Sequence, residues 1–414
     1  MADRFVDKES SNDGGLKRPI VYFLGGYHPV NESFIRSPPS NVILRSRVPT
    51  EAFDNFERPS QYDPSWSSRK RIADLTFKTV GSPRLVPVLR KYDLIHTNGS
   101  IIPLCLTPWV ASIENPSAFY GFNEDWHEKK SMRRRLARFL LSPRCKAILP
   151  YSNASRDYIF KGLSDWEDDL EKKTHVLYPA IDRYLIYNNQ KDKPGKNRTD
   201  KVRFLFVGNH FFDKGGREVL RAFQAINKTS ACELVVVSSA PAHQQDEFAV
   251  MARELKSTSH VRFYPTGIPR AELLDLYRSS NVFVLPSYMD QVPFVLLEAM
   301  AAGLPIIGSN SFAIPEMVID GVNGFNIKSP LLAFPEEKLR TEEHLRFYRK
   351  AVLDEKNFDG VVEQLTDAMS KLIASPETIE RLGRESLDMV TSGRFSTDSR
   401  NETLARIYDD SIKS

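Results

Sequence analysis

The sequence has few cysteines and no long apolar run, and these absences exclude several classes of protein. Three cysteines among 414 residues, each in apolar surroundings, indicate buried reduced thiols rather than a disulfide framework, which favours a cytoplasmic protein. They are Cys105, Cys145 and Cys232. No apolar run approaches the roughly 18 residues of a membrane-spanning helix. The first residues are polar and lack the apolar core of a secretory signal.

Charge and motif content exclude further classes. A net charge of +4 is too small to predict nucleic-acid binding. The metal-binding patterns H-E-x-x-H and C-x-x-C are absent, and so is the phosphate-binding G-x-x-x-x-G-K-[ST]. Neither opening strand is followed by the dinucleotide-binding G-x-G-x-x-G, which disfavours a nicotinamide enzyme. We therefore predict no bound metal, no cofactor and no nucleic-acid partner.

What the sequence does contain is a repeated alternation of short apolar runs and helix-length amphipathic segments. The runs are rich in Val, Ile and Leu and do not alternate with polar residues, as expected for strands buried on both faces of a parallel sheet. This βαβ pattern predicts an α/β protein with two doubly wound domains. The expected strands are 20–26, 92–98, 108–114, 146–152 and 174–180, then 202–208, 232–239, 260–266, 281–287 and 304–309.

A chain of 414 residues is too long for one core, and the polar, Pro- and Gly-containing stretch 187–201 is the best candidate for a linker. Packing of the closing helix back on the N-terminal domain is one open arrangement. The expected division is a flexible tail 1–18, an N-terminal domain 19–186, the linker, a C-terminal domain 202–392 with a charged helical insertion at 329–358, and a closing helix over 393–414.

Two acids flank the expected start of an apolar helix in the second half. Pro293 suits the first helical position and Gly303 suits the C-terminal stop, so we expect a helix over 293–302. Asp290 lies just before this helix, and Glu298 lies about 7.5 Å along its axis from Pro293. A capping acid and an exposed helix acid are the ordinary alternative.

The amino end of that helix is also an expected anion site. The amides of Phe294 and Val295 and the helix dipole favour a phosphate there. Carboxylates accept two hydrogen bonds from vicinal hydroxyls, so Asp290 and Glu298 suit sugars on either side. A diphosphate with a polyol at each end fits this pattern.

Two further segments are typical of phosphate sites. In "FLFVGNHFFDKGGREVLRAF" (204–223), Lys214 stands beside glycines before an amphipathic helix. An ordinary loop lysine is the alternative there. In "FLGGYHP" (23–29), Gly25 and Gly26 follow the first strand and would let backbone approach a ligand closely, although a tight turn explains them equally well.

These segments, in this order, resemble the retaining GT-B glycosyltransferases of family 4, the group 1 glycosyl transferases. The resemblance extends from about Pro19 to nearly the end of the chain and is strongest over 202–328, where "LLEAMAAGLPIIGS" is close to the family's most recognisable phrase. The matching elements are Gly208 with Lys214 and Gly215, Asp290-x7-Glu298, Pro315 with Glu316, and Gly321 with Gly324.

The resemblance implies two Rossmann-like domains facing across a cleft. It implies retaining, metal-independent transfer of a sugar, of hexosyltransferase type, from a nucleotide-diphosphate sugar to a glycan or lipid-linked acceptor. The implied catalytic residues are Lys214 at the diphosphate, Glu298 at the ribose and Asp290 at the donor sugar. The implied donor-binding residues are Gly25, Gly26, Asn209, Gly267, Ile268, Phe294 and Val295.

The sequence departs from the family pattern at three positions. The family's arginine after Gly208 is Asn209, which removes one cation from the diphosphate site, and Arg203 and Arg217 are the candidates to replace it. The first glutamate of the E-x7-E motif is Asp290, which keeps the charge on a shorter side chain. Glu114 stands where many members have a histidine, and is a candidate acceptor-binding acid.

Two other features and two other functions stay open. His28 is a second candidate acceptor-binding residue. The basic segment 128–146 could bind the anionic inner face of the cell membrane, which would make the protein peripheral, or form an ordinary solvated helix. The alternative functions are a catalytically impaired GT-B-fold binding protein and another nucleotide-sugar enzyme such as an epimerase.

Overall fold

The computed structural model describes residues 18–26, 29–48, 81–182, 201–335 and 339–414. Two compact units divide the chain. Unit 1 comprises Met1–Tyr151, Ser155–Asp182 and Thr397–Ser414, and unit 2 comprises Ser152–Ala154 and Arg183–Ser396. Apart from one residue each, the expected tail 1–18 and linker 187–201 lie outside the described residues, as does His28.

Unit 2 is built on a six-stranded parallel sheet with the order β10-β9-β8-β11-β12-β13. The order reverses between β8 and β11, and ligands of such sheets bind beyond the carboxyl ends of the strands at this switch point. The strands are β8 (Val202–Asn209), β9 (Cys232–Ser239), β10 (Val261–Pro265), β11 (Val282–Val284), β12 (Ile306–Ser309) and β13 (Gly324–Ile327).

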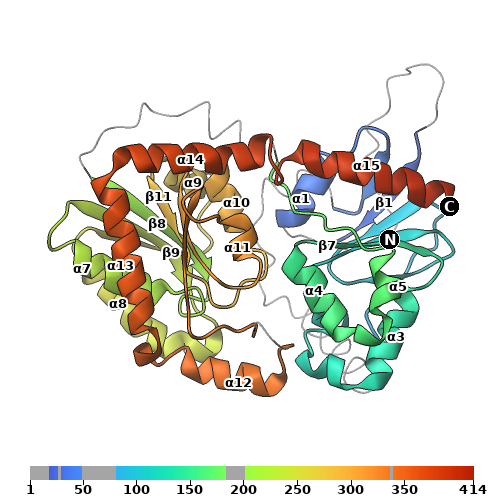
Figure 1. Ribbon diagram of the computed structural model, residues 1–414, viewed down its shortest axis with the longest axis horizontal. Helices are drawn as coiled ribbons and strands as arrows, with labels where there is room; N and C mark the ends of the chain where they lie inside the picture. Colours follow the sequence, from blue (N-terminus) through green and yellow to red (C-terminus); the bar gives the residue numbers. More distant parts are fainter. Residues whose placement is uncertain (1–17, 27–28, 49–80, 183–200, 336–338) are drawn as a thin grey trace. The chain divides into compact units, whose positions relative to one another are not determined.

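Helices cover both faces of this sheet (Figure 1). Right-handed crossovers put α7 and α8 on one face and α10 and α11 on the other, because the strand order runs in opposite directions from the switch point. The helices are α7 (Gly216–Ile226), α8 (Gln245–Ser257), α9 (Arg270–Arg278), α10 (Phe294–Ala301), α11 (Ile314–Met317), α12 (Glu342–Ala351), α13 (Asp359–Ala374) and α14 (Pro376–Thr391).

Unit 1 contains a five-stranded parallel sheet with the order β2-β1-β4-β6-β7, in which the order reverses beside β1. A separate pair of strands, β3 (Leu85–Pro87) and β5 (Ile102–Leu104), lies beside it. The five strands are β1 (Ile20–Leu24), β2 (Ile43–Ser46), β4 (Leu94–Thr97), β6 (Trp109–Ile113) and β7 (Cys145–Pro150).

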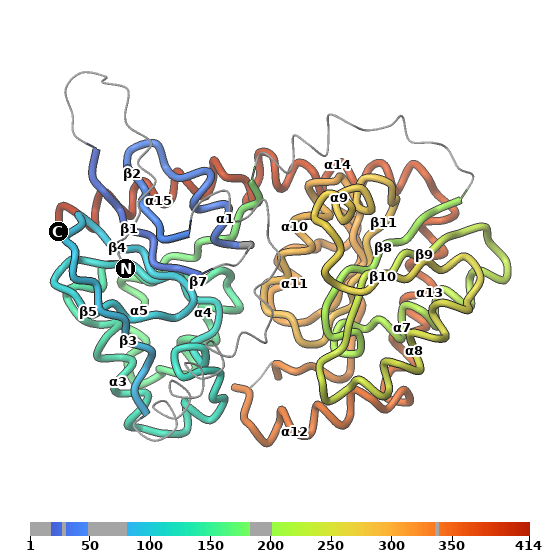
Figure 2. The backbone as a smooth tube through the Cα atoms, turned by 180° about the vertical axis from the view of Figure 1, so that it is seen from behind, coloured from blue at the N-terminus to red at the C-terminus, as the bar shows by residue number. Residues whose placement is uncertain are grey.

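The last helix of the chain belongs to unit 1, where it packs against β4 and β7 (Figure 2). This helix, α15 (Thr397–Lys413), is fixed by Arg400, whose guanidinium donates to the carbonyls of Ser33 and Ser37 at 3.1 and 2.6 Å. The other helices of the unit are α1 (Pro29–Arg36), α3 (Lys130–Leu140), α4 (Asn153–Gly162) and α5 (Glu167–Glu171).

The predicted α/β class with parallel sheets is confirmed, but one expected strand is wrong. Residues 174–180 form no strand, and only Thr174 makes an isolated bridge, to Ile148 of β7. The segment does run along the edge of β7, where the amides of His175 and Leu177 donate to the carbonyls of Ile148 and Pro150 at 2.9 and 2.8 Å, but this pairing is too sparse to form a strand. No helix in the described ranges is both long and apolar enough to cross a membrane.

Candidate functional site

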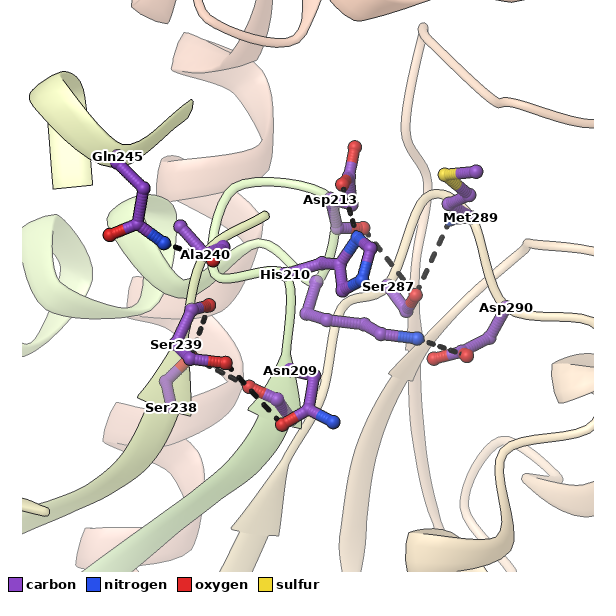
Figure 3. Close-up of polar contacts among 12 residues, drawn as sticks. Asn209, His210, Asp213, Ser238, Ser239, Ala240, Gln245, Ser287, Met289 and Asp290 are labelled. Atoms are coloured by element: carbon purple, nitrogen blue, oxygen red, sulfur yellow. Dashed lines mark hydrogen bonds and ion pairs between the residues drawn. The ribbon is translucent and has the colours of Figure 1, made fainter. Parts of the chain in front are cut away.

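The loops after β8 and β11 meet at the switch point of the unit 2 sheet (Figure 3). The ammonium of Lys214, in the first loop, is ion-paired with the carboxylate of Asp290, in the second. Both side chains are largely buried, and Asp290 Oδ2 is a buried oxygen with no hydrogen bond to a described residue. The sequence therefore places two of its predicted catalytic residues in direct contact.

Gly215 lets the first loop press against the second. Its φ is +74°, and a Cβ added there would lie 2.7 Å from Pro286 Cγ and 2.8 Å from the Pro286 carbonyl oxygen. A side chain would therefore be strained and would also push the loops apart. This explains a glycine directly after Lys214 in terms of packing as well as phosphate binding.

Hydrogen bonds hold the two loops together. The Tyr288 amide donates to the carbonyl of Asp213 at 2.9 Å, and the Ser287 hydroxyl donates to the same carbonyl at 3.5 Å. Ser309 of β12 donates to the Ser287 carbonyl at 2.5 Å. Lys214 and Asp290 therefore lie on two loops that hydrogen bonds hold together, rather than on loops that are independent of each other.

His210 and Asp213 lie in the same turn as Lys214 and were not among the residues predicted from the sequence. His210 Nδ1 lies 3.4 Å from Asp213 Oδ2, and Figure 3 shows the ring turned toward that carboxylate. The φ of His210 is +65°, which is uncommon for a residue other than glycine. A histidine directly after Asn209, at the end of a buried strand, was the only available signal.

Asn209 is the last residue of β8, one residue beyond the expected end of that strand, and its side-chain oxygen accepts a hydrogen bond from Ser239 at 3.5 Å. The two arginines expected to replace the missing cation do not reach this loop. Arg203 lies at the opposite end of β8 and pairs with Glu233 at 3.0 Å. Arg217 is buried, and it pairs with Glu218 at 2.7 Å while donating to carbonyls near the end of α12.

The apolar helix predicted over 293–302 is α10, and it starts one residue later than predicted. Pro293 is the N-cap, with extended backbone at φ −74° and ψ 109°, rather than the first helical residue. The Leu296 amide donates to the Pro293 carbonyl at 3.0 Å. Phe294 and Val295 therefore supply the first helical amides, which have no acceptor earlier within the helix.

Glu298 is buried in the fold and does not turn out into solvent. It is 8% exposed, and the hydroxyl of Tyr277 on α9 donates to its Oε2 at 3.1 Å. Burial, and after it the Glu298 carboxylate, raises the pKa of Tyr277 well above its usual range, so the hydroxyl keeps its proton. The exposed-helix-acid alternative is wrong for this residue.

Gly267 and Ile268 follow β10, at the same edge of the sheet as the end of β8. Gly267 has φ +94° and is exposed, with no atom within 4 Å of an added Cβ. Open space and left-handed backbone suit close approach by a flat ligand.

In unit 1, Gly25 and Gly26 follow β1 beside the reversal of strand order. Asn31 donates to the Gly26 carbonyl at 2.7 Å and accepts a hydrogen bond from Asn98 after β4. Glu114 follows β6 at the same edge and is half-buried. The predicted unit 1 residues therefore gather at one edge of their own sheet.

Both units of this chain can be compared with known proteins. Residues 188–340, which include every predicted site residue of unit 2, match the family of glycosyl transferases group 1. The chain carries a glycosyl transferases group 1 domain. That group 1 domain contains the Lys214 and Asp290 loops, the whole of α10, and Gly267 with Ile268.

The chain is 24% identical over 298 residues to an uncharacterized glycosyltransferase of Methanocaldococcus jannaschii, and the match covers 66% of this chain and 74% of that protein. It is 31% identical over 157 residues to a glycogen synthase of Mycobacterium tuberculosis, over 36% of this chain and 37% of that protein.

Solved structures extend the likeness beyond the group 1 domain. Anabaena HepE, crystallised with UDP and glucose, is 13% identical and has a TM-score of 0.57, over 95% of this chain and 100% of that chain. The structural neighbours are GT-B glycosyltransferases, so the predicted fold of two Rossmann-like domains is confirmed.

Proposed function

We propose that this chain is a retaining, metal-independent glycosyltransferase that moves a sugar from a nucleotide-diphosphate sugar to a glycan or lipid-linked acceptor. The observation that supports it best is the contact between Lys214 and Asp290 at the switch point of a group 1 domain, beside the amino end of α10. The loops after β8 and β11, with the start of α10, thus offer an ammonium, backbone amides and a carboxylate with an unpaired oxygen.

Each of these groups has a task in binding the donor. The ammonium of Lys214 and the amides of Phe294 and Val295 attract the diphosphate. Asp290 Oδ2 accepts from a sugar hydroxyl, which removes the cost of burying that oxygen unpaired. Glu298, held by Tyr277, accepts from the ribose hydroxyls.

The same groups stabilise the transition state. The bond between the sugar carbon and the diphosphate breaks, and its electron pair leaves with the phosphate oxygen. The acceptor oxygen bonds to the same face of the carbon, and its proton passes to the departing phosphate. Fixed cations and amides aimed at the leaving oxygen lower the barrier, because they gain interaction as its charge grows.

The sharpest test combines a donor screen with one substitution. We expect turnover of one class among UDP-, GDP- and ADP-sugars, and Lys214→Ala should lower kcat/KM at least about tenfold, because the diphosphate loses its ammonium. Lys228→Ala removes an exposed lysine of the same unit and should leave the rate unchanged.

The outcomes separate the competing functions. Nucleotide-sugar binding without turnover would identify a binding protein, and conversion of the donor sugar without transfer would identify an epimerase. Equal rates for Lys214→Ala and wild type at limiting donor would remove the site assignment.

Membrane contact through 128–146 is a separate proposal. Arg134 and Arg138 of α3 are exposed, whereas Leu136 and Leu140 are buried in the unit 1 core. Any binding therefore rests on charge rather than on insertion of apolar side chains. Sedimentation with anionic vesicles at low and high salt tests it, and no binding at low salt ends the idea.

A further inference from the structure

His210 is held in a strained conformation at the centre of the candidate site. Its φ is +65°, a conformation that costs free energy in a residue with a side chain. Two hydrogen bonds keep the turn closed: the Lys214 amide donates to the His210 carbonyl at 3.1 Å, and the Phe211 amide donates to Ser239 at 2.9 Å. Strain of this kind is often found at functional sites.

The imidazole of His210 is oriented by a buried carboxylate. Its Nδ1 lies 3.4 Å from Asp213 Oδ2, and the Asp213 side chain is only 4% exposed. The imidazole itself is 48% exposed, and its Nε2 has no hydrogen bond to any residue that the structure describes. One ring nitrogen is therefore anchored while the other side of the ring faces outward.

Asp213 is itself fixed by the second loop of the site. Its carbonyl accepts the Tyr288 amide, so the residue cannot shift without separating the loops. The same turn carries Lys214, whose ammonium lies on Asp290. Figure 3 shows His210, Asp213, Ser287 and Asp290 gathered in this one region.

Neither Arg203 nor Arg217 replaces the cation that is missing at Asn209, since both are engaged elsewhere. We propose that His210 is a further donor-binding residue: as an imidazolium with Nδ1–H directed at Asp213, it donates a hydrogen bond from Nε2–H to a phosphate oxygen of the nucleoside diphosphate, beside Lys214. Asp213 is then a positioning residue that holds the ring. This inference rests on the proposed function and adds to it a residue outside the motif.

The test is a binding titration on the full-length chain with UDP, GDP and ADP, continued with the one that binds most tightly. His210→Asn keeps a residue that tolerates positive φ but removes the imidazole. It should weaken binding of the diphosphate about tenfold and leave competition by the corresponding nucleoside unchanged, because only the phosphate contact is lost.

The chain offers a matched control. His260 is also exposed and has φ +64°, but it lies before β10, at the opposite end of the sheet. His260→Asn should bind like the wild type. His210→Lys, which restores a cation, should recover most of the affinity that His210→Asn loses.

A double-mutant cycle tests the role of Asp213. Asp213→Asn should weaken binding in the wild-type chain but have little further effect in His210→Asn, since the ring it positions is gone. Equal losses in both backgrounds would make Asp213 purely structural and overturn that part of the inference.

The remaining outcomes are distinguishable. If His210→Asn binds the diphosphate as tightly as the wild type while Lys214→Ala does not, the inference fails and the proposed function stands. If the wild type binds none of the three diphosphates, the proposed function fails and His210 loses its role with it.

Discussion

At the scale of single residues, the partner of Glu298 decides how rigidly a ribose would be held. Tyr277 donates to one carboxylate oxygen at 3.1 Å and fixes the side chain. Tyr277→Phe should therefore raise the KM for the donor about threefold with little change in kcat, whereas Glu298→Ala should lower kcat/KM at least about tenfold. Initial rates at varied donor concentration measure both effects.

A matched variant controls for loss of a hydroxyl in the same unit. Tyr264→Phe, on β10, should leave both constants unchanged. A donor KM that is the same in Tyr277→Phe as in the wild type would mean that Glu298 needs no orienting partner.

The sequence could nominate Lys214, Asp290 and Glu298 as candidate site residues because their spacing is carried by a motif on a strand–loop–helix pattern. It could not identify His210 or Asp213. These two residues are candidates because His210 has a positive φ and because two loops 70 or more residues apart meet there. Neither property can be predicted from the types of the neighbouring residues. The expected roles of Arg203 and Arg217 failed for the same reason.

At the scale of elements, Arg400 is the main tie between α15 and α1. Its buried guanidinium donates to two carbonyls and lies over the Phe34 ring at 4.6 Å. Arg400→Met should lower the free energy of unfolding of unit 1 by about 2–4 kcal/mol, because buried carbonyls lose their donors. Urea unfolding followed by tryptophan fluorescence measures this.

Tryptophan fluorescence reports on unit 1 alone. Trp109, Trp126 and Trp166 belong to that unit, and residues 201–396 contain no tryptophan. Arg406→Met, an exposed change on the same helix, is the control and should have little effect. An unfolding midpoint for Arg400→Met equal to that of the control would show that α15 is held by its apolar contacts alone.

His96 makes the contact between β4 and α15 sensitive to acid. It lies between Tyr408 at 2.6 Å and Ser112 at 2.7 Å, and burial, followed by Arg400, lowers its pKa from the usual value to about 3. The unfolded chain therefore binds a proton that the folded chain does not, between pH 6.5 and 3. Stability is lost as the pH falls through that range.

The size of this effect follows from linkage. From pH 7 to pH 5, the wild type should lose about 2 kcal/mol more of unit 1 stability than His96→Gln loses, whatever their absolute stabilities. Urea unfolding at both pH values gives the two differences. Equal losses of stability in the wild type and in His96→Gln between the two pH values would show that the protonation of His96 does not change on unfolding.

Element prediction succeeded where runs were long and failed where they were short. The expected strands 202–208 and 232–239 correspond closely to β8 and β9, since each of these apolar strands has eight residues. Strands β2, β3, β5 and β13 have only three or four residues each and were not predicted, whereas β4, β11 and β12 are as short but lie within longer apolar runs. Residues 174–180 had the composition of a strand, but they make only a few backbone hydrogen bonds and one isolated bridge to the edge strand β7.

At the scale of the whole molecule, the three predicted catalytic residues lie in unit 2 and the candidate acceptor-binding residue Glu114 lies in unit 1, so we expect nucleotide binding and sugar transfer to be separable. A fragment of residues 183–396 contains Lys214, Asp290 and Glu298 and has its own sheet. It should bind the nucleoside diphosphate within about fivefold of the full chain but transfer no sugar. Calorimetric titration and a transfer assay check the two halves of this prediction.

The same fragment carrying Lys214→Ala is the control and should bind weakly. A folded 183–396 fragment, verified by circular dichroism, that fails to bind nucleotide would show that unit 1 supplies part of the donor site. Gly25 and Gly26 would then be the first residues to test.

The overall α/β architecture was predictable because strands buried on both faces need little tertiary information. The order of those strands was not, and it is the reversal between β8 and β11 that brings the Lys214 and Asp290 loops together. The resemblance to the group 1 glycosyl transferases predicted that Lys214 and Asp290 belong to one site, which the apolar periodicity alone could not predict.

The return of α15 to unit 1 has a consequence for biosynthesis. A ribosome must translate residues 183–396 after the first sheet has emerged and before the helix that covers β4 and β7 exists. At about 5–20 residues per second, the nascent sheet stays uncovered for roughly ten to forty seconds. In that interval a holdase chaperone would find the apolar surface that Arg400 and its helix later occlude.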